Sequence, residues 1–242
     1  MAPLLSVEDI SRRFGGIVAL DHVSFDANAG EIVGLIGPNG AGKTTAFNVI
    51  TRLYRPDEGD VLLDGETLLR TPPHRVVTRG IARTFQNVEL FPTMTVEENV
   101  LVGGHSRDTF LGERRARAAA LEILRAVELE RFAGRPAAGL PYGTLKRIEL
   151  ARALAARPRL LLLDEPAGGL NHEEVDELAA FIRRLRDERE LTVLLVEHHM
   201  NLVMTISDHV HVLDFGKKIA GGTPAEVARD PRVIEAYLGV AS

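Results

Sequence analysis

The chain has 242 residues, of which 45% are hydrophobic and 26% charged, and 29 basic against 34 acidic side chains give a formal charge of −5. This is the composition of an ordinary globular protein, and the absence of cysteine excludes disulfides, cysteine-ligated zinc and a cysteine nucleophile. No apolar run approaches the roughly 18 residues that cross a bilayer, and the N-terminus lacks a signal-peptide layout, so we expect a cytoplasmic chain unless a partner holds it at a membrane. The mild acidity argues against nucleic acid as a partner.

Short strand-like segments are distributed along the whole chain. Alternating apolar and polar positions between glycine-bounded turns predict antiparallel strands at residues 4–28 and 59–69. Compact apolar runs at residues 31–37, 159–164 and 191–197 are typical of strands covered on both faces of a parallel sheet. Helical segments separate these runs, and this order predicts a doubly wound α/β fold.

Two helical regions interrupt the predicted strands. Residues 88–157 are mostly helical by pattern and form a candidate lobe inserted into the core. Before the last strand, apolar residues recur on one stripe between residues 175 and 185, which predicts an amphipathic helix. Asn171 and Glu174 have the spacing of a capping box, so we expect this helix to begin directly after Asn171.

A glycine-rich segment after the first parallel strand fits the phosphate-loop pattern G-x-x-x-x-G-K-[ST]. It consists of Gly37, Pro38, Asn39, Gly40, Ala41, Gly42, Lys43, Thr44 and Thr45. The glycines allow backbone N–H groups to surround a β-phosphate, and the following helix adds the positive end of its dipole. Lys43 can neutralise the β- and γ-phosphates, and the Thr44 hydroxyl can bind Mg²⁺. We therefore expect a nucleoside triphosphate with Mg²⁺ here.

The next chemical signal is an acidic pair after four leucines. Asp164 ends the predicted strand and can hold Mg²⁺ through its water shell, while Glu165 can polarise the water that attacks a γ-phosphate. A GTPase would need a base-reading Asn-Lys-x-Asp segment, and no asparagine in the chain is followed by lysine. The pair therefore favours an ATPase, with a phosphate-loop kinase as an alternative that needs an acceptor-binding lid.

Together these motifs resemble the ATP-binding subunit of an ABC transporter over essentially the whole chain. The resemblance implies a P-loop NTPase core with a mainly parallel sheet, an antiparallel β subdomain and an inserted α-helical subdomain. It implies that Gln86 contacts Mg²⁺ or the attacking water, that His198 contacts the γ-phosphate and that Phe14 stacks on adenine. The chain would be one cassette, residues 1–242, with a catalytic core at about 1–87 and 158–242 and a helical lobe at about 88–157.

The family's signature sequence corresponds here to Leu140-Pro-Tyr-Gly-Thr144, which precedes a predicted helix that Pro158 stops. The resemblance implies that Tyr142 and Gly143 face the ATP bound by a second ATP-binding subunit, identical or related, so that two chains meet head to tail. Pro141 and Thr144 depart from the commoner Leu-Ser-Gly-Gly-Gln, and Asn171 replaces the usual Asp. These departures bear on the affinity of the contact with the second subunit.

Finer detail resembles the ATP-binding subunits of branched-chain amino-acid importers. The matching segments are Ile81–Asn87, Leu140–Gly143, Val196–Met204 and Val233–Gly239. This implies that the chain hydrolyses ATP to drive the import of branched-chain or other hydrophobic amino acids. It would bind permease subunits at the inner face of the membrane, and a solute-binding protein would deliver the amino acid to those subunits. Alternatives are the ATPase of a lipid or lipopolysaccharide exporter and a soluble ABC ATPase acting on DNA or ribosomes, although the chain has no heptad arm or basic tract.

The permease is expected to dock near Gln86–Thr95. This segment places Leu90, Phe91, Pro92 and Met94 in a loop-like stretch, and apolar loop residues suggest a docking groove. A local patch of the hydrophobic core is the competing interpretation.

Overall fold

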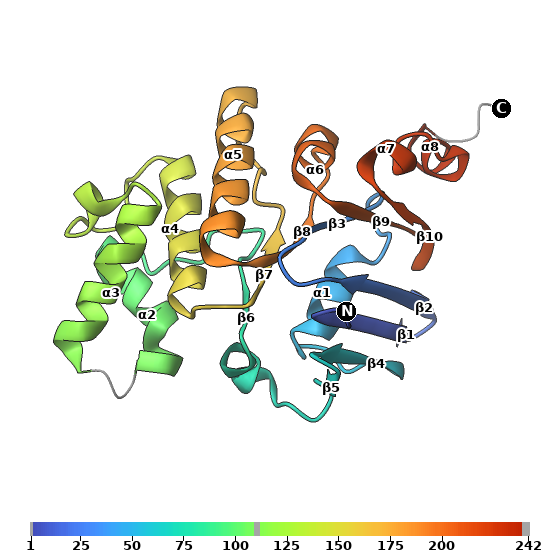
Figure 1. The fold of residues 1–242 in the computed structure, drawn as a ribbon, viewed down its shortest axis with the longest axis horizontal. Helices are drawn as coiled ribbons and strands as arrows, with labels where there is room; N and C mark the ends of the chain where they lie inside the picture. The colour runs from blue at the N-terminus through green and yellow to red at the C-terminus, as the bar shows by residue number, and fades with distance from the viewer. Residues whose placement is uncertain (1, 109–111, 239–242) are drawn as a thin grey trace.

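The structure, a computed structural model, describes residues 2–108 and 112–238, so Gly239 of the C-terminal segment lies outside the described residues. It contains two sheets that share a layer of core (Figure 1). The larger sheet has six strands in the order β10-β9-β3-β8-β7-β6. Their bounds are β3 Ile32–Ile36, β6 Ile81–Arg83, β7 Leu160–Asp164, β8 Thr192–Val196, β9 His209–Asp214 and β10 Lys217–Gly222. All neighbours pair in parallel except β10, which runs antiparallel to β9.

The smaller sheet is antiparallel and confirms the alternation near the N-terminus. Its order is β2-β1-β4-β5, with bounds β1 Leu5–Phe14, β2 Ile17–Ala27, β4 Glu58–Leu63 and β5 Glu66–Thr67. Helix α1, Lys43–Ile50, lies between the two sheets, because its apolar side chains join one hydrophobic cluster with residues from both. The first turn of α1 is therefore held at the edge where β3 ends.

The strand β7 shows why the larger sheet is buried on both faces. Leu160 and Leu162 belong to the cluster that contains α1, whereas Leu161 and Leu163 belong to the cluster on the other face. Side chains alternate along a strand, so a run of four leucines contributes to both layers. Each buried leucine stabilises the fold by about 1.5–3 kcal/mol, and a polar substitution at any of them would remove that contribution.

Helices α5, His172–Arg189, and α6, Met200–Ile206, cover the second face of the larger sheet. The capping box at the start of α5 is confirmed: the Asn171 side chain accepts from the Glu174 N–H, and the Glu174 carboxylate accepts from the Asn171 N–H. Helices α7, Pro224–Val227, and α8, Pro231–Leu238, follow β10 at the C-terminal end.

Three helices form the side of the molecule away from the antiparallel sheet (Figure 1). They are α2, Val96–Asp108, α3, Glu113–Ala126, and α4, Tyr142–Ala155. They occupy the chain between β6 and β7, and α4 buries apolar side chains in the same cluster as α5. The α/β fold with a mainly parallel sheet is confirmed. Among the described residues, no helix combines the length and apolar character that a membrane span requires.

Candidate active site

The phosphate loop lies between β3 and α1, where backbone strain and crowding call for glycine. Gly42 precedes α1 with φ 103°, a left-handed conformation that L side chains rarely adopt. A Cβ at Gly37 would lie 2.1 Å from the Leu213 carbonyl oxygen, so no side chain fits there. The Lys43 ammonium donates to the carbonyls of Gly37 at 2.7 Å and Pro38 at 3.0 Å. The Lys43 side chain therefore stabilises the loop conformation by bonding to its backbone carbonyls.

Burial and two nearby carboxylates act in opposite directions on the pKa of Lys43. Burial lowers the pKa of Lys43, and the nearby Glu165 and Asp164 carboxylates offset part of that effect. The lysine and the acidic pair therefore interact electrostatically although they lie far apart in sequence. Thr44 is exposed and Thr45 is half-buried in the first turn of α1, which leaves the Thr44 hydroxyl accessible.

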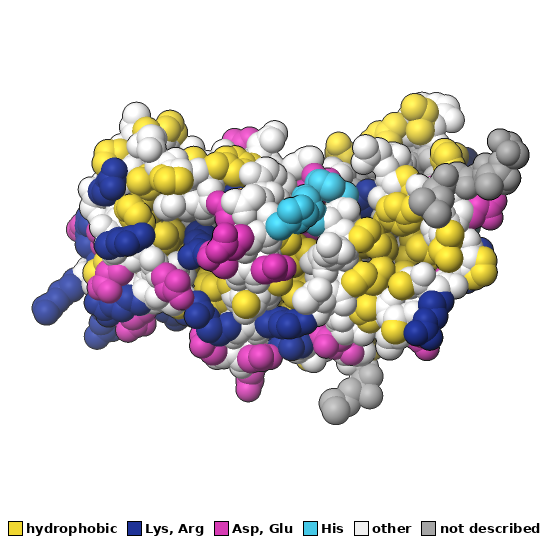
Figure 2. All heavy atoms as spheres, turned by 90° about the horizontal axis from the view of Figure 1, so that it is seen from above, with side chains coloured by type: hydrophobic (Ala, Val, Ile, Leu, Met, Phe, Trp, Pro, Cys, Tyr) yellow, Lys and Arg dark blue, Asp and Glu magenta, His cyan; other side chains and the backbone are white. Residues whose placement is uncertain are grey.

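Glu165, Gln86 and His198 converge at the ends of neighbouring strands. The Gln86 Nε2 donates to Glu165 Oε2 at 2.7 Å, and His198 Nδ1 lies 3.6 Å from the same oxygen. Glu165 itself has φ 47°, a left-handed conformation that is uncommon for a residue with a side chain and is characteristic of functional sites. Histidine side chains lie at the surface beside acidic ones near the middle of the face shown in Figure 2. The three polar side chains therefore form an accessible cluster.

Asp164 is buried, and its partner is a residue that the sequence analysis missed. The Arg83 guanidinium donates to Asp164 Oδ2 at 2.6 Å and to Asn48 Oδ1 at 2.7 Å, and it stacks over the rings of Phe47 and Phe85. The available signal was the position of Arg83 at the end of a short strand, three residues before Gln86. An arginine thus lies in direct contact with an expected magnesium ligand.

Comparisons with known proteins agree with this geometry. The family pattern described as "ABC transporter" matches residues 20–168, more than half of the chain. The chain belongs to the ABC transporter family. As an ATP-binding cassette of that family, it binds nucleotide and is an ATPase. A second pattern, described as "Branched-chain amino acid ATP-binding cassette transporter", matches residues 217–242 of this ABC ATPase.

Known relatives of this ABC ATPase match it almost from end to end. The high-affinity branched-chain amino acid transport ATP-binding protein BraF of Pseudomonas aeruginosa is 46% identical over 99% of both chains. Among solved structures, the ADP conformation of the ABC transporter cassette MJ1267 has a TM-score of 0.91 and 32% identity, over 99% of this chain and 100% of that one. The cassette MJ0796, in a dimeric post-hydrolysis state bound to ADP and Pi, has a TM-score of 0.80 and 28% identity, over 91% and 98%.

The signature segment of this ABC ATPase lies in the first turn of α4. We predicted that the segment precedes the helix, and this was wrong, because α4 already begins at Tyr142, after Pro141. Proline is favourable at a helix start, where its missing N–H needs no partner. A Cβ built on Gly169 would lie 3.0 Å from the Tyr142 ring, and one built on Gly143 would lie 3.4 Å from Glu174 Oε1. The segment therefore contacts the loop between Glu165 and α5.

Phe14 ends β1 and remains partly exposed, with 39% of its surface accessible. Its ring meets Tyr54 edge-on at 5.2 Å, and the Arg12 guanidinium lies 4.8 Å from its centre. An accessible aromatic ring of this kind can stack on a base.

Two charged side chains of α4 are buried against the segment that follows β6. Lys146 donates to the Gln86 carbonyl at 2.8 Å, and Glu149 accepts from the Phe85 N–H at 3.0 Å. Burial raises the pKa of Glu149, against the opposing effect of these hydrogen-bond and charge partners. The segment that carries Gln86 is thus attached to the helix that carries Tyr142.

Proposed function

We propose that this chain hydrolyses ATP for an importer of branched-chain or other hydrophobic amino acids. The observation that carries the chemistry is the 2.7 Å contact between Gln86 Nε2 and Glu165 Oε2, with His198 beside the same oxygen. The transport assignment is supported by the 46% identity to BraF, a branched-chain amino acid transport protein by its name. The match of residues 217–242 to the branched-chain cassette pattern supports it independently.

The phosphate loop binds the β- and γ-phosphates of ATP in this proposal. Backbone N–H groups of residues 37–45 surround the phosphates, while Lys43 leaves the carbonyls of its own loop and contacts them. The adenine stacks on Phe14, whose ring is accessible at the end of β1.

The donors present at the site fit Mg²⁺, which prefers oxygen ligands. The Thr44 hydroxyl is accessible, and Asp164 and Gln86 supply a carboxylate and an amide oxygen near the acidic end of β7. These three residues would hold the ion. When bound, Mg²⁺ neutralises negative charge on the phosphate oxygens.

Glu165 acts as the general base. Its carboxylate takes the proton from the attacking water, and Gln86, already bonded to that carboxylate, orients it. His198, whose Nδ1 lies 3.6 Å from Glu165 Oε2, donates to the γ-phosphate. The left-handed backbone of Glu165 aims the side chain toward this position.

The chain supplies only half of each ATP site in this proposal. Tyr142 and Gly143 lie at the start of α4, and helix N-termini bind anions. Their neighbours are in the loop before α5, so we infer that they serve ATP bound by a second ATP-binding subunit, identical or related, placed head to tail. The dimeric state of MJ0796 with ADP and Pi supports this arrangement.

The permease subunits dock near Gln86–Thr95 and hold the chain at the inner face of the membrane, and a solute-binding protein acts through them. Phe91 is 45% exposed, which suits a docking residue. Leu90, in contrast, packs against the core, so the core interpretation holds for this position. The Phe91 backbone is held by the buried Asn99 side chain, which accepts from its N–H at 2.8 Å and donates to its carbonyl at 3.0 Å.

The Glu165→Gln variant tests the hydrolysis mechanism. It keeps the size of the side chain and removes the base, so ATP binding should persist while turnover falls at least about 100-fold. Binding of a fluorescent ATP analogue and release of phosphate measure the two effects. Undiminished hydrolysis would refute the assignment of Glu165.

Transport is tested with the permease subunits that co-purify with this chain from membranes. Reconstituted with them, the chain should drive uptake of labelled leucine in the presence of ATP, and the Glu165→Gln variant should not. Uptake that is independent of this chain would refute the import assignment. If the reconstituted complex instead removed lipid from membranes in an ATP-dependent manner, this would favour the lipid or lipopolysaccharide exporter.

A further inference from the structure

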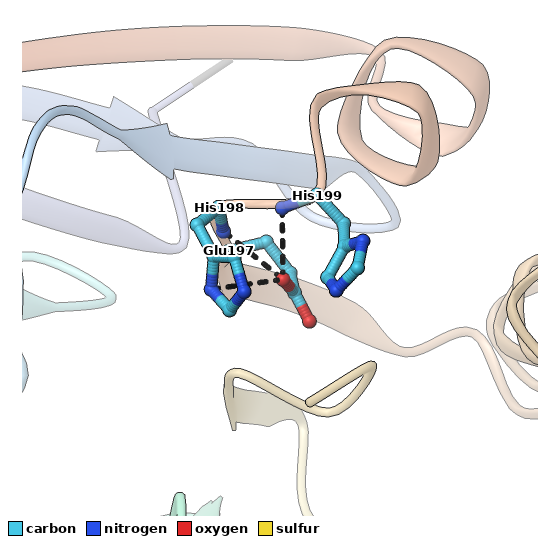
Figure 3. Close-up of side chains that lie close together, drawn as sticks. All are labelled: Glu197, His198 and His199. Atoms are coloured by element: carbon cyan, nitrogen blue, oxygen red, sulfur yellow. Dashed lines mark hydrogen bonds and ion pairs between the residues drawn. The ribbon is translucent and has the colours of Figure 1, made fainter. Parts of the chain in front are cut away.

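Glu197 is the most deeply buried carboxylate next to the site, and the mechanism above does not use it. It follows β8 directly and has 0% of its surface exposed. Its carboxylate accepts three backbone N–H groups. That of Ala167 lies 2.7 Å from Oε1, and those of His198 at 3.0 Å and His199 at 3.2 Å bond to Oε2, as Figure 3 shows. A buried carboxylate without such donors would be strongly destabilising, and here backbone dipoles take the place of a cation.

These three side chains could in principle hold a metal ion, because each offers a ligand atom within 4.8 Å of the others. Both Glu197 oxygens, however, are already engaged by backbone N–H groups, and the two histidine rings follow it on the same short segment. A cation would have to compete with these bonds for the same two oxygens. We therefore interpret Glu197 as a residue that fixes backbone by accepting these hydrogen bonds.

The anchored N–H groups belong to the two loops that carry Glu165 and His198. Ala167 is two residues beyond Glu165, whose own N–H donates to the Val196 carbonyl at 2.8 Å. The left-handed conformation of Glu165 costs of order 1–3 kcal/mol and persists only where its surroundings hold it. The Oε1 atom of Glu197 holds the turn after this strained residue, and its Oε2 atom holds the backbone of His198.

We infer that Glu197 is a positioning residue for ATP hydrolysis, which joins the loop after β7 to the loop after β8 and so sets the approach of His198 to Glu165. The inference rests on the proposed roles of those two residues. Glu197 does not itself contact the nucleotide. Its carboxylate holds the backbone on both sides of the 3.6 Å pair, and its Oε2 also lies 3.8 Å from His198 Nδ1.

The chemistry of the carboxylate explains why an amide cannot replace it. Ionised glutamate only accepts, with two oxygens that face three N–H groups. In Glu197→Gln one oxygen becomes an NH₂ group that faces another donor, so the hydrogen bonds to at least one of the two oxygens are lost. Glu197→Asp keeps the charge but is one methylene shorter, so it can still accept from His199, two residues on, as an Asx turn, while it no longer reaches Ala167.

The test measures steady-state hydrolysis by the full-length purified chain. We expect kcat to fall at least tenfold in Glu197→Gln and Glu197→Asp, with the KM for ATP within threefold of the unmodified chain. Amide hydrogen exchange should be faster at Ala167 but not at His199 in Glu197→Asp, and in Glu197→Gln it should be faster either at Ala167 or at His198 and His199. Glu226→Gln is the control, since this carboxylate also accepts a backbone N–H, from Thr223 at 2.7 Å, in the capping box of α7; its kcat should be unchanged.

A double-mutant cycle separates positioning from general destabilisation. If Glu197 acts through His198, then Glu197→Gln costs less in a His198→Ala background than in the unmodified chain. Equal costs in both backgrounds, or a kcat within threefold in both Glu197 variants, would overturn the inference. Failure of the proposed function looks different, because His198→Ala and Glu165→Gln would then themselves retain turnover.

Discussion

The Arg83 guanidinium and the Asp164 carboxylate form a buried ion pair at 2.6 Å, with 8% and 5% of their side-chain surfaces exposed. The two residues lie 81 positions apart in sequence and come from the neighbouring parallel strands β6 and β7. The pair places a fixed positive charge beside the carboxylate proposed to hold Mg²⁺. In the proposed mechanism, an arginine guanidinium therefore lies beside the metal and phosphate groups.

Removing the arginine leaves Asp164 as an uncompensated buried charge. We predict that Arg83→Met lowers the free energy of unfolding by about 3–5 kcal/mol, measured by urea denaturation. Arg159→Met is the matched control, because Arg159 pairs with Asp64 at the surface, where ion pairs contribute less than about 1 kcal/mol. Equal effects of the two substitutions would contradict the importance of burial.

The contact between Lys146 and the Gln86 carbonyl at 2.8 Å predicts an effect on catalysis. Lys146→Met keeps most of the side-chain volume but releases the segment that carries Gln86, so kcat should fall severalfold with little change in ATP affinity. A hydrogen bond from a charged group contributes about 1.5–3 kcal/mol, which bounds the loss of stability. Arg147→Met, at the next position and paired with Glu177 at the surface, should leave kcat unchanged; a matching loss there would argue against a specific role for Lys146.

Stability should depend on pH through His211. Burial lowers the pKa of His211 from 6.5 to about 4, so between these values the unfolded chain binds more protons and the folded protein loses stability as the pH falls. The shift corresponds to about 3 kcal/mol across that interval. His211→Gln keeps a donor for the Asp26 carbonyl and should be less sensitive to acid. Denaturant unfolding at pH 7 and pH 4 measures the difference, and equal acid sensitivity of both proteins would contradict the prediction.

Docking of the permease should depend on Phe91. Phe91→Asp places a charge on the exposed ring position, so we expect weaker co-purification with the permease subunits and reduced leucine uptake, while ATP hydrolysis by the isolated chain is unchanged. Ile234→Asp removes an equally exposed apolar residue from α8 and serves as the control. Normal assembly of the Phe91 variant would place the docking surface elsewhere.

Local patterns predicted most elements of this fold. The four leucines before Asp164 form β7, the glycine-rich segment leads into α1 at Lys43, and the Asn171–Glu174 capping box begins α5 as expected. Each depends on residues within one or two turns of chain, where propensity and hydrogen bonding act without distant partners.

The errors concern positions where distant parts of the chain meet. Lys146 and Glu149 are charged and would be expected at the surface of α4, yet the segment after β6 covers them, and its backbone groups bond to both side chains. Arg83 carried no motif and was missed, although it is the partner of Asp164. Periodicity along one helix does not reveal which segment packs on its polar side.

The sequence by itself therefore determined the composition class, the antiparallel strands near the N-terminus, the strands β3, β7 and β8, and the phosphate loop, because these depend on residue types at short spacing. It also supplied the candidate reactive side chains. Only the tertiary structure decided how those side chains meet. Gln86 reaches Glu165 across 79 positions, and Glu197 reaches Ala167 across 30. Such contacts follow from the order of strands in the parallel sheet, which brings the ends of β6, β7 and β8 together.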